Sequence, residues 1–290
     1  MAEQPGTLLY YLKRSTEFLE KKEIPNPRVD AEWILSDLLN LPRIKLYSQF
    51  EMPLGQKEID TYRERIVERS KRKPVAYITG KKGFHKFEYL VSEDVLIPRP
   101  ETEELVDYLW KKKEELFLSS DPIHIWDLCS GSGCIGLSLT QLLPSSVVTL
   151  SDLSEKAVTV SRRNAEKYNV SDRTHFYVSD LDLALPDGLE FDLVVSNPPY
   201  IPESEKPEIM PDVLDYEPHL ALFVSDFNEF HKRLLDAISK RLKPGGKLML
   251  ETHPLYIKDL EAMAITLGFV DTKIVLDSSK KERFLFAKKL

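Results

Sequence analysis

After Glu101 the chain alternates short apolar runs with helical segments, and this alternation limits its fold more than any other feature. The five apolar runs are residues 123–128, 147–151, 175–179, 191–196 and 247–251. Runs of this length without polar alternation are typical of strands buried on both faces of a parallel sheet. Because parallel strands need crossover connections, which are usually helical, the pattern predicts an α/β fold with a doubly wound sheet. Such sheets bind ligands at the carboxyl ends of their strands.

The two ends of the chain depart from this alternation. Residues 270–276 and 284–288 are expected to pair as an antiparallel hairpin, which gives a seven-stranded sheet with an antiparallel last strand. The first 75 residues instead have helical periodicity, with predicted helices after Thr7, after Pro27 and from about Gln56. We therefore expect a small helical domain before the sheet.

Residues 76–100 are predicted to connect the two domains. We expect a β-hairpin here, with strands at 75–78 and 84–91 around the Gly-containing turn 79–83. Residues 97–100, with the sequence Ile-Pro-Arg-Pro, should be extended, because a residue before proline avoids the helical region.

Composition bears on where such a protein works. No apolar run approaches the roughly 20 residues that cross a bilayer, and residues 1–7 lack the basic-then-apolar pattern of a signal peptide. We therefore expect a cytoplasmic protein with no membrane partner. Cys129 and Cys134 have no His or Cys at ligand spacing, so we expect reduced thiols and no metal site.

Charge is shared unevenly between the two parts of the chain. Residues 1–75 hold 14 Lys and Arg against 12 Asp and Glu, whereas residues 76–290 hold 26 against 35. An acidic sheet domain is a poor match for a protein that grips a polyanion there, so we expect no stable nucleic-acid complex. The basic run at 63–73 is typical of a solvated helix face; a partner-docking patch is the alternative.

The loop after the first apolar run has the features of a cofactor site. Residues 129–136 read Cys-Ser-Gly-Ser-Gly-Cys-Ile-Gly, and glycines at a strand-to-helix turn let the backbone approach a ligand whose charge the helix N-terminus can meet. Asp152 and Asp180 end the next two strands, where carboxylates can accept ribose hydroxyls or an adenine amino group. Asp127 lies just before the loop and suits the cationic methionyl end of S-adenosylmethionine.

The same loop formally matches a dinucleotide fingerprint through Gly131, Gly133 and Gly136. The acidic residues at three successive strand ends, the C-terminal hairpin and the lack of an evident hydride-transfer His/Asp pair favour S-adenosylmethionine. A strand edge rich in Asp without any ligand is the remaining alternative.

The fourth run delivers Asn197-Pro198-Pro199-Tyr200, which we call the acceptor strip. An amide nitrogen is a poor nucleophile because its lone pair is delocalised into the carbonyl group. The Asn197 side-chain oxygen and the Pro198 carbonyl can accept its two N–H bonds, which weakens this conjugation and aims the nitrogen. Tyr200 can stack on the flat acceptor. The strip therefore predicts transfer to a planar nitrogen; a merely rigid proline loop is the alternative.

A longer pattern connects these motifs. It consists of Asn-Pro-Arg-Val-Asp-Ala-Glu at 26–32, Pro-Val-Ala-Tyr-Ile-Thr-Gly at 74–80, Val-Leu-Ile-Pro-Arg-Pro-Glu-Thr-Glu at 95–103, residues 127–136 and 196–201, and Glu217-Pro218. Through these segments the chain resembles the HemK/PrmC family over nearly its whole length. These are the protein-(glutamine-N5) methyltransferases of bacterial peptide chain release factors. The acceptor strip is also shared with adenine-N6 and some RNA methyltransferases, whereas the segment 97–103 and the N-terminal part are more specific to the family.

The resemblance implies three regions. These are a helical domain at 1–75 that docks the release factor, the hairpin connector at 76–100, and a Rossmann-like class I methyltransferase domain at 101–290. It implies S-adenosyl-L-methionine as the cofactor, and as the acceptor the glutamine of a Gly-Gly-Gln motif, which places the enzyme in translation termination. We expect a monomer.

The resemblance also assigns site residues. Cofactor contacts are implied for Cys129, Ser130, Gly131, Ser132, Gly133, Asp152, Asp180, Leu181 and Asn197, beside the Asp127 contact expected from its position. Glutamine contacts are implied for Asn197, Pro198, Pro199 and Tyr200, with catalysis expected from Asn197, Pro198 and Tyr200. Arg99 and Glu101 are expected at the site entrance, with a structural ion pair as the alternative.

Three features depart from the family pattern. Cys129 stands where a glycine is often found, His253 is untypical, and residues 280–290 lack a Gly-rich, Asp-rich ending. Two other functions stay open: a nucleic-acid adenine or guanine N-methyltransferase, which would need a basic recognition surface, and a non-catalytic cofactor-binding partner, which would have no evident use for the acceptor strip.

Overall fold

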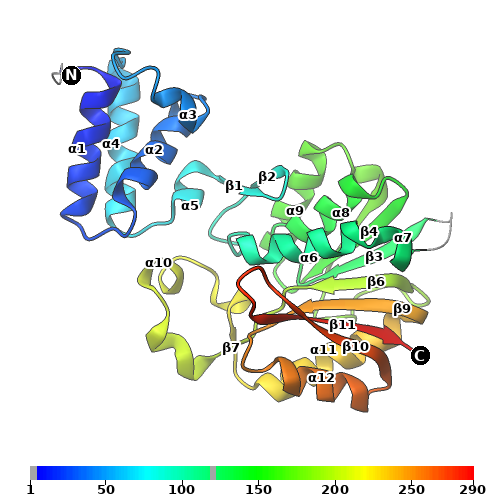
Figure 1. Cartoon of the computed structure of the whole chain (residues 1–290). Coiled ribbons are helices and arrows are strands. Elements are labelled where there is room, and N and C mark those ends of the chain that lie inside the picture. Colours follow the sequence, from blue (N-terminus) through cyan, green and yellow to red (C-terminus); the bar gives the residue numbers. More distant parts are fainter. Residues whose placement is uncertain (1–4, 118–121) are drawn as a thin grey trace. The chain divides into compact units, whose positions relative to one another are not determined.

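The computed structural model of the chain describes residues 5–117 and 122–290, and these residues form two compact units (Figure 1). The helical unit contains the chain up to Gly80 and the segment Met210–Tyr216. The sheet unit contains Lys81–Ile209 and Glu217–Leu290. The chain therefore passes between the two units at Gly80, at Ile209 and again at Tyr216.

The helical unit has the predicted helices. Its helices are α1 (Leu8–Glu20), α2 (Pro27–Leu38), α3 (Arg43–Leu46), α4 (Gln56–Ser70), α5 (Val75–Thr79) and α10 (Pro211–Leu214). Thr7 caps α1, as its position suggests, because its side chain accepts a hydrogen bond from the backbone N–H of Tyr10. Leu12, Ile34 and Tyr62 are fully buried at the centre of its core.

One basic residue of the run 63–73 is not on a solvated face. Arg69 is buried, and its guanidinium forms ion pairs of 2.7 Å with both Asp30 and Asp212. Arg72 also pairs with Asp212, and the Tyr216 hydroxyl donates a hydrogen bond to the Lys71 carbonyl. These contacts hold the segment Met210–Tyr216 to the helices of the same unit.

The predicted hairpin is displaced along the chain. The prediction of a strand at 75–78 is wrong, because Pro74 precedes a short helix, α5, that ends at Gly80 with φ 73°. Glycine in the left-handed region is a common helix end, so Thr79-Gly80 terminates α5 and does not form the hairpin turn. The hairpin pairs β1 (Lys81–Phe84) with β2 (Phe87–Leu90) around His85 and Lys86.

The sheet unit is built on a seven-stranded sheet of order β10-β11-β9-β6-β3-β4-β5. Its strands are β3 (Ile123–Leu128), β4 (Ser146–Asp152), β5 (Thr174–Val178), β6 (Phe191–Ser196), β9 (Leu242–Glu251), β10 (Phe269–Leu276) and β11 (Glu282–Lys289). The last strand, β11, inserts between β9 and β10 and is antiparallel to both, whereas β5, β4, β3, β6 and β9 are mutually parallel. The predicted class I methyltransferase sheet is thereby confirmed.

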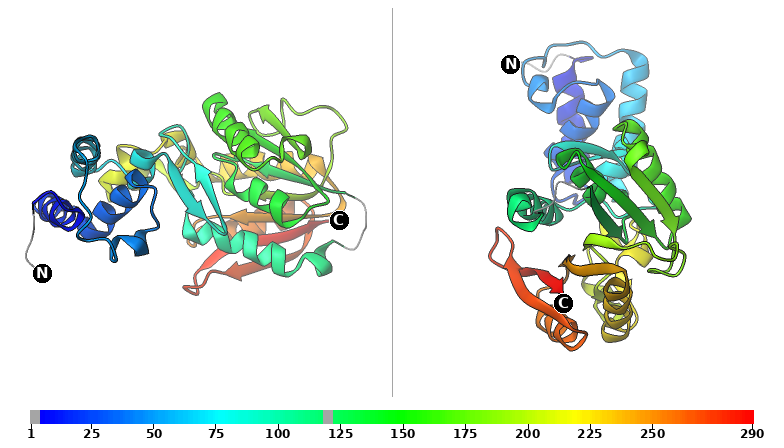
Figure 2. Two further views of the ribbon diagram at one scale, coloured as in Figure 1. Left: turned by 90° about the horizontal axis from the view of Figure 1, so that it is seen from above. Right: turned by 90° about the vertical axis from the view of Figure 1, so that its right-hand side faces the viewer.

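Helices cover both faces of this sheet. One face packs against α6 (Pro100–Lys111), α8 (Cys134–Leu142) and α9 (Glu155–Lys167), and the other against α11 (Phe227–Arg241) and α12 (Ile257–Thr266) (Figure 1). Alternate residues of β3 enter the two cores, Ile125 on one face and Trp126 on the other. Figure 2 shows the same layers from two other sides, with the hairpin of β10 and β11 in red at the sheet edge.

Short elements complete the sheet unit. They are α7 (Lys113–Leu116), η1 (Ser171–Arg173), η2 (Glu203–Glu208), η3 (His219–Ala221), and the paired strands β7 (Ile201–Pro202) and β8 (Phe223–Val224). In residues 5–117 and 122–290, no helix is long and apolar enough to cross a membrane.

Candidate active site

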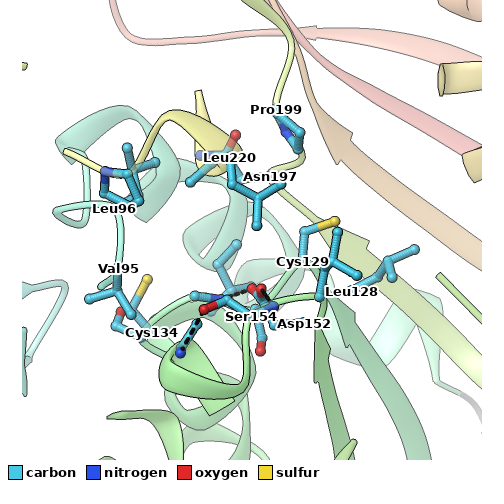
Figure 3. Close-up of a pocket in the computed structure, with 18 of the residues that line it drawn as sticks. Val95, Leu96, Leu128, Cys129, Cys134, Asp152, Ser154, Asn197, Pro199 and Leu220 are labelled. Carbon is cyan, nitrogen blue, oxygen red and sulfur yellow. Dashed lines mark hydrogen bonds between the residues drawn. The ribbon is translucent and has the colours of Figure 1, made fainter. Parts of the chain in front are cut away.

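A pocket lies where β3, β4 and β6 end, as expected for a doubly wound sheet (Figure 3). Asp152 and Ser154 lie on one side of it, Asn197, Pro199 and Leu220 on the opposite side, with Cys129 between them. Of the predicted site residues, the pocket wall contains Cys129, Ser130, Gly131, Ser132, Asp152, Asp180, Leu181, Asn197 and Pro199. Asp127, Gly133, Pro198 and Tyr200 do not line it.

The loop after β3 turns sharply at its first residue. Cys129 has φ 59°, Gly131 has φ 53° and Gly133 has φ 78°. A non-glycine residue in this left-handed region costs roughly 1–2 kcal/mol, a strain that glycine would not have at the Cys129 position. The Gly131 backbone N–H donates to Asp152 Oδ2 at 2.9 Å, so the loop is tied to the end of β4.

Asp127 lies beneath this loop and supports it. Its side chain is fully buried, and Oδ2 accepts a 2.8 Å hydrogen bond from the backbone N–H of Gly136 at the start of α8. Burial, together with the charge of Asp152, raises the pKa of the Asp127 carboxyl well above its ordinary value, against the effect of that hydrogen bond. Its Oδ1 has no partner in the described residues, and neither have the buried hydroxyls of Ser130 and Ser132.

The other two acidic strand ends differ in environment. Asp152 accepts hydrogen bonds from the backbone of Gly131 and, at 2.9 Å, of Ser154, while burial raises the pKa of its carboxyl. Asp180 is more exposed, and its Oδ2 lies 2.7 Å from Nη2 of Arg233 on α11. The geometry therefore holds Asp152 firmly, whereas the Asp180 carboxylate already has a cation beside it.

The acceptor strip divides into residues at the pocket and residues behind it. Asn197 and Pro199 line the pocket, while Pro198 is buried. The Tyr200 ring lies 6.3 Å from the His253 ring, and burial raises the pKa of its hydroxyl. The untypical His253 therefore packs beside the acceptor strip, next to its last residue.

Two polar residues beside the strip were missed by the sequence prediction. The Asn197 Nδ2 donates to Thr102 Oγ1 at 3.1 Å, and Thr102 donates to Glu251 Oε2 at 2.7 Å. Thr102 and Glu251 are almost completely buried. Glu251 could have been predicted from the sequence, because it ends β9 as Asp152 ends β4. An acidic residue at a strand end is the signal that indicated Asp152 and Asp180.

For Arg99 the sequence left two alternatives open, a place at the site entrance or a structural ion pair. It lines the pocket, and its Nη2 pairs with Glu217 Oε1 at 2.7 Å. Glu217 is buried and also accepts a hydrogen bond from the Ile97 backbone N–H. Among the described residues, His, Cys, Asp and Glu form no group that could hold a metal ion.

Comparison with known proteins gives matches along nearly the whole chain. The family model of the PrmC N-terminal domain matches residues 11–80, and that of the methyltransferase small domain matches residues 114–215. A release factor glutamine methyltransferase of Leptospira interrogans is 47% identical over 98% of both chains. One of Chlorobaculum tepidum is 37% identical, over 98% of this chain and 97% of the relative.

Solved structures show the same fold at low identity. The catalytic domain of hMettl16, crystallised with an RNA hairpin, has a TM-score of 0.53 at 15% identity, covering 81% of this chain and 82% of that one. A methyltransferase from Pyrococcus furiosus has a TM-score of 0.51 at 18% identity, covering 78% and 97%.

Proposed function

Because the chain belongs to the family of the release factor glutamine methyltransferases, we propose that it methylates the side-chain amide nitrogen (N5) of a release factor glutamine. The resemblance in sequence implies the glutamine of a Gly-Gly-Gln motif. The observation that carries the proposal is the position of Asn197, whose amide lines the pocket next to the loop after β3. Its Oδ1 accepts no hydrogen bond from the described residues and can take one from an acceptor N–H.

The residues around the loop fit S-adenosylmethionine, on which the family depends. Asp127 Oδ1 can accept from an ammonium group, and the hydroxyls of Ser130 and Ser132 can donate to a carboxylate; all three atoms are buried without a partner among the described residues. Asp152 would hold ribose hydroxyls. When bound, the cofactor supplies an electrophilic methyl group on a positively charged sulfur.

The chain's own residues would prepare the acceptor nitrogen. Asn197 Oδ1 and the Pro198 carbonyl accept its two N–H bonds, which turns its lone pair out of conjugation and holds it in one direction. Pro198 and Pro199 fix the backbone of the strip. No strong base is required, because the methylated nitrogen is acidic and can lose its proton to water.

The helical unit is proposed to dock the release factor. On it, Trp33 is 51% and Ile44 is 74% exposed, and the Arg43 guanidinium lies 5.4 Å from the Trp33 ring centre. Exposed aromatic and Arg side chains are typical of protein interfaces. We further propose that the enzyme acts as a monomer in the cytoplasm, where its substrate works, without a stable nucleic-acid partner.

Labelled S-adenosylmethionine tests the proposal directly. The enzyme is incubated with it and, in separate reactions, with release factor, DNA and ribosomal RNA. We expect label on the release factor, at the glutamine identified by peptide mapping. Label on nucleic acid alone would overturn the proposal in favour of a nucleic-acid N-methyltransferase, and label nowhere would favour a non-catalytic cofactor-binding protein.

Asn197→Ala tests the acceptor role. It should lower kcat roughly a hundredfold or more while cofactor affinity, measured by calorimetry, changes little. Asn228→Ala, an exposed Asn on α11, is the matched control. Full activity of Asn197→Ala would refute the role given to this side chain.

A further inference from the structure

The orientation of the Asn197 amide is set by a chain of two hydrogen bonds. Asn197 follows β6, Thr102 lies in the first turn of α6, and Glu251 ends β9. The Asn197 Nδ2 donates to Thr102 Oγ1 at 3.1 Å, and the Thr102 hydroxyl donates to Glu251 Oε2 at 2.7 Å. Thr102 is 2% and Glu251 is 1% exposed, so water does not compete for these bonds.

The direction of these bonds follows from the chemistry of the groups. An ionised carboxylate only accepts hydrogen bonds, so the single Thr102 proton is used on Glu251. The Thr102 oxygen then has only acceptor capacity left for Asn197, which must present its NH₂ to it. The two ends of an Asn amide have nearly the same shape, and the hydrogen-bond network is what distinguishes them. The Asn197 carbonyl oxygen is therefore the end left for the pocket.

We propose that Thr102 and Glu251 are positioning residues that hold Asn197 with its carbonyl oxygen, and not its NH₂ group, toward the acceptor. The inference rests on the proposed function, because only an acceptor that offers N–H bonds needs an oxygen at this place. With the amide reversed, the Asn197 NH₂ group would face an N–H of the acceptor nitrogen, and the Asn197 oxygen would face the Thr102 oxygen. The acceptor nitrogen would then lose one of the two contacts that aim it.

We call the two hydrogen bonds from Asn197 to Thr102 and from Thr102 to Glu251 the relay. The direction of its bonds depends on whether the Glu251 carboxyl is ionised, and therefore on pH. Burial raises the pKa of the Glu251 carboxyl to about 7, against the Thr102 hydrogen bond and the positive charges of Arg283 and Arg99; Glu101 adds to the rise. The other titratable groups that interact electrostatically with this carboxylate are Tyr200 and Cys134. A protonated Glu251 can donate to Thr102, which frees the Thr102 proton for the Asn197 oxygen and reverses the relay.

Substitution of Thr102 tests the relay. Thr102→Val keeps the shape but removes the hydroxyl, and should lower kcat roughly a hundredfold with little change in cofactor affinity. Thr102→Ser restores the hydroxyl and should recover kcat to within roughly threefold. Thr252→Val is the matched control, because this neighbouring buried hydroxyl has no partner among the described residues; its kcat should stay within roughly twofold. Thermal unfolding of each variant verifies that it is folded at the assay temperature.

Glu251→Gln tests the direction of the relay. A Gln amide can donate or accept, so the variant should lose roughly tenfold in kcat. The wild-type kcat should rise with pH through a step near 7, whereas the variant should have no such step between about pH 6 and about pH 8.5. Wild-type kcat in Thr102→Val, or an unchanged step in Glu251→Gln, would overturn the proposal.

These outcomes are separate from a failure of the proposed function. If the wild-type enzyme methylates a nitrogen on nucleic acid and not on a release factor, the proposed substrate is wrong. The same variants assayed on that acceptor then decide the relay, because an amino nitrogen also needs the Asn197 oxygen. If release factor is methylated and all the variants match the wild type, the relay is wrong and the proposed function stands.

Discussion

Gly136 lies directly against the carboxylate of Asp127. A Cβ at Gly136 would be 2.8 Å from Asp127 Oδ2 and 3.0 Å from Val148 Cγ1, and the Gly136 N–H already donates to that oxygen. The third glycine of the loop is therefore required for the close approach of α8 to β3. This contact also fixes which Asp127 oxygen is free for a ligand, because only Oδ1 lacks a partner among the described residues.

We expect Gly136→Ala to destabilise the protein by about 2 kcal/mol, because both the Asp127 carboxylate and Val148 are buried and cannot move aside freely. The displaced carboxylate should also weaken cofactor binding. Chemical denaturation and calorimetry measure the two effects. Gly83→Ala is the control, since a Cβ there has no atom within 4 Å. Equal stability of the two variants would contradict the packing argument.

Asp152 is expected to act on cofactor binding and not on the acceptor. Asp152→Ala removes the acceptor of the Gly131 and Ser154 N–H groups, and should weaken cofactor binding roughly tenfold to a hundredfold. The exposed Asp187→Ala is the control. Saturating cofactor should restore most of the kcat. A variant with wild-type cofactor affinity would exclude Asp152 from the cofactor site.

The local elements of this fold could be predicted because their signals are local. The runs at 123–128 and 191–196 coincide with β3 and β6, since strands buried on both faces have no polar interruptions. The short helix α5 was mistaken for a strand because its apolar residues do not distinguish the two, and only the left-handed Gly80 shows that the chain turns there. The run at 247–251 is only the end of β9, which begins at Leu242.

The polar contacts of the site could not be predicted in the same way. Thr102 and Glu251 are separated by 149 residues in the chain, and Asn197 and Thr102 by 95. No periodicity or spacing connects such residues; only the sheet order, which brings β6 beside β9, places their ends together. The acidic strand ends indicated that a ligand site exists, but not that Arg233 occupies one side of Asp180.

Arg69 should be one of the most important residues for the helical unit. Its side chain is only 6% exposed and pairs with Asp30 and Asp212. Arg69→Met would leave both carboxylates without this partner, and we expect a loss of about 3 kcal/mol. Amide hydrogen exchange at 213–215 should also become faster, because the segment Met210–Tyr216 loses the ion pair between Asp212 and the buried Arg69. The exposed Lys57→Met on α4 is the control; slow exchange in Arg69→Met would refute the attachment.

His231 should make the sheet unit sensitive to acid. It is fully buried on α11, its Nδ1–H donates to the Phe227 carbonyl, and its Nε2 has no partner among the described residues. Burial lowers the pKa of its imidazole to about 4, so the folded protein holds it neutral while the unfolded chain takes up a proton below about pH 6.5. His231 therefore does not lower the free energy of unfolding above about pH 6.5, and it lowers that free energy increasingly as the pH drops toward 4.

His231→Leu should remove this part of the acid sensitivity. Because the shift corresponds to about 3 kcal/mol, the free energy of unfolding of the variant should fall less than that of the wild type between about pH 6.5 and about pH 4.5. Urea denaturation at several pH values measures the difference. The exposed His175→Leu is the control and should keep the wild-type slope. If His231→Leu also keeps it, protonation of another group unfolds the protein in acid.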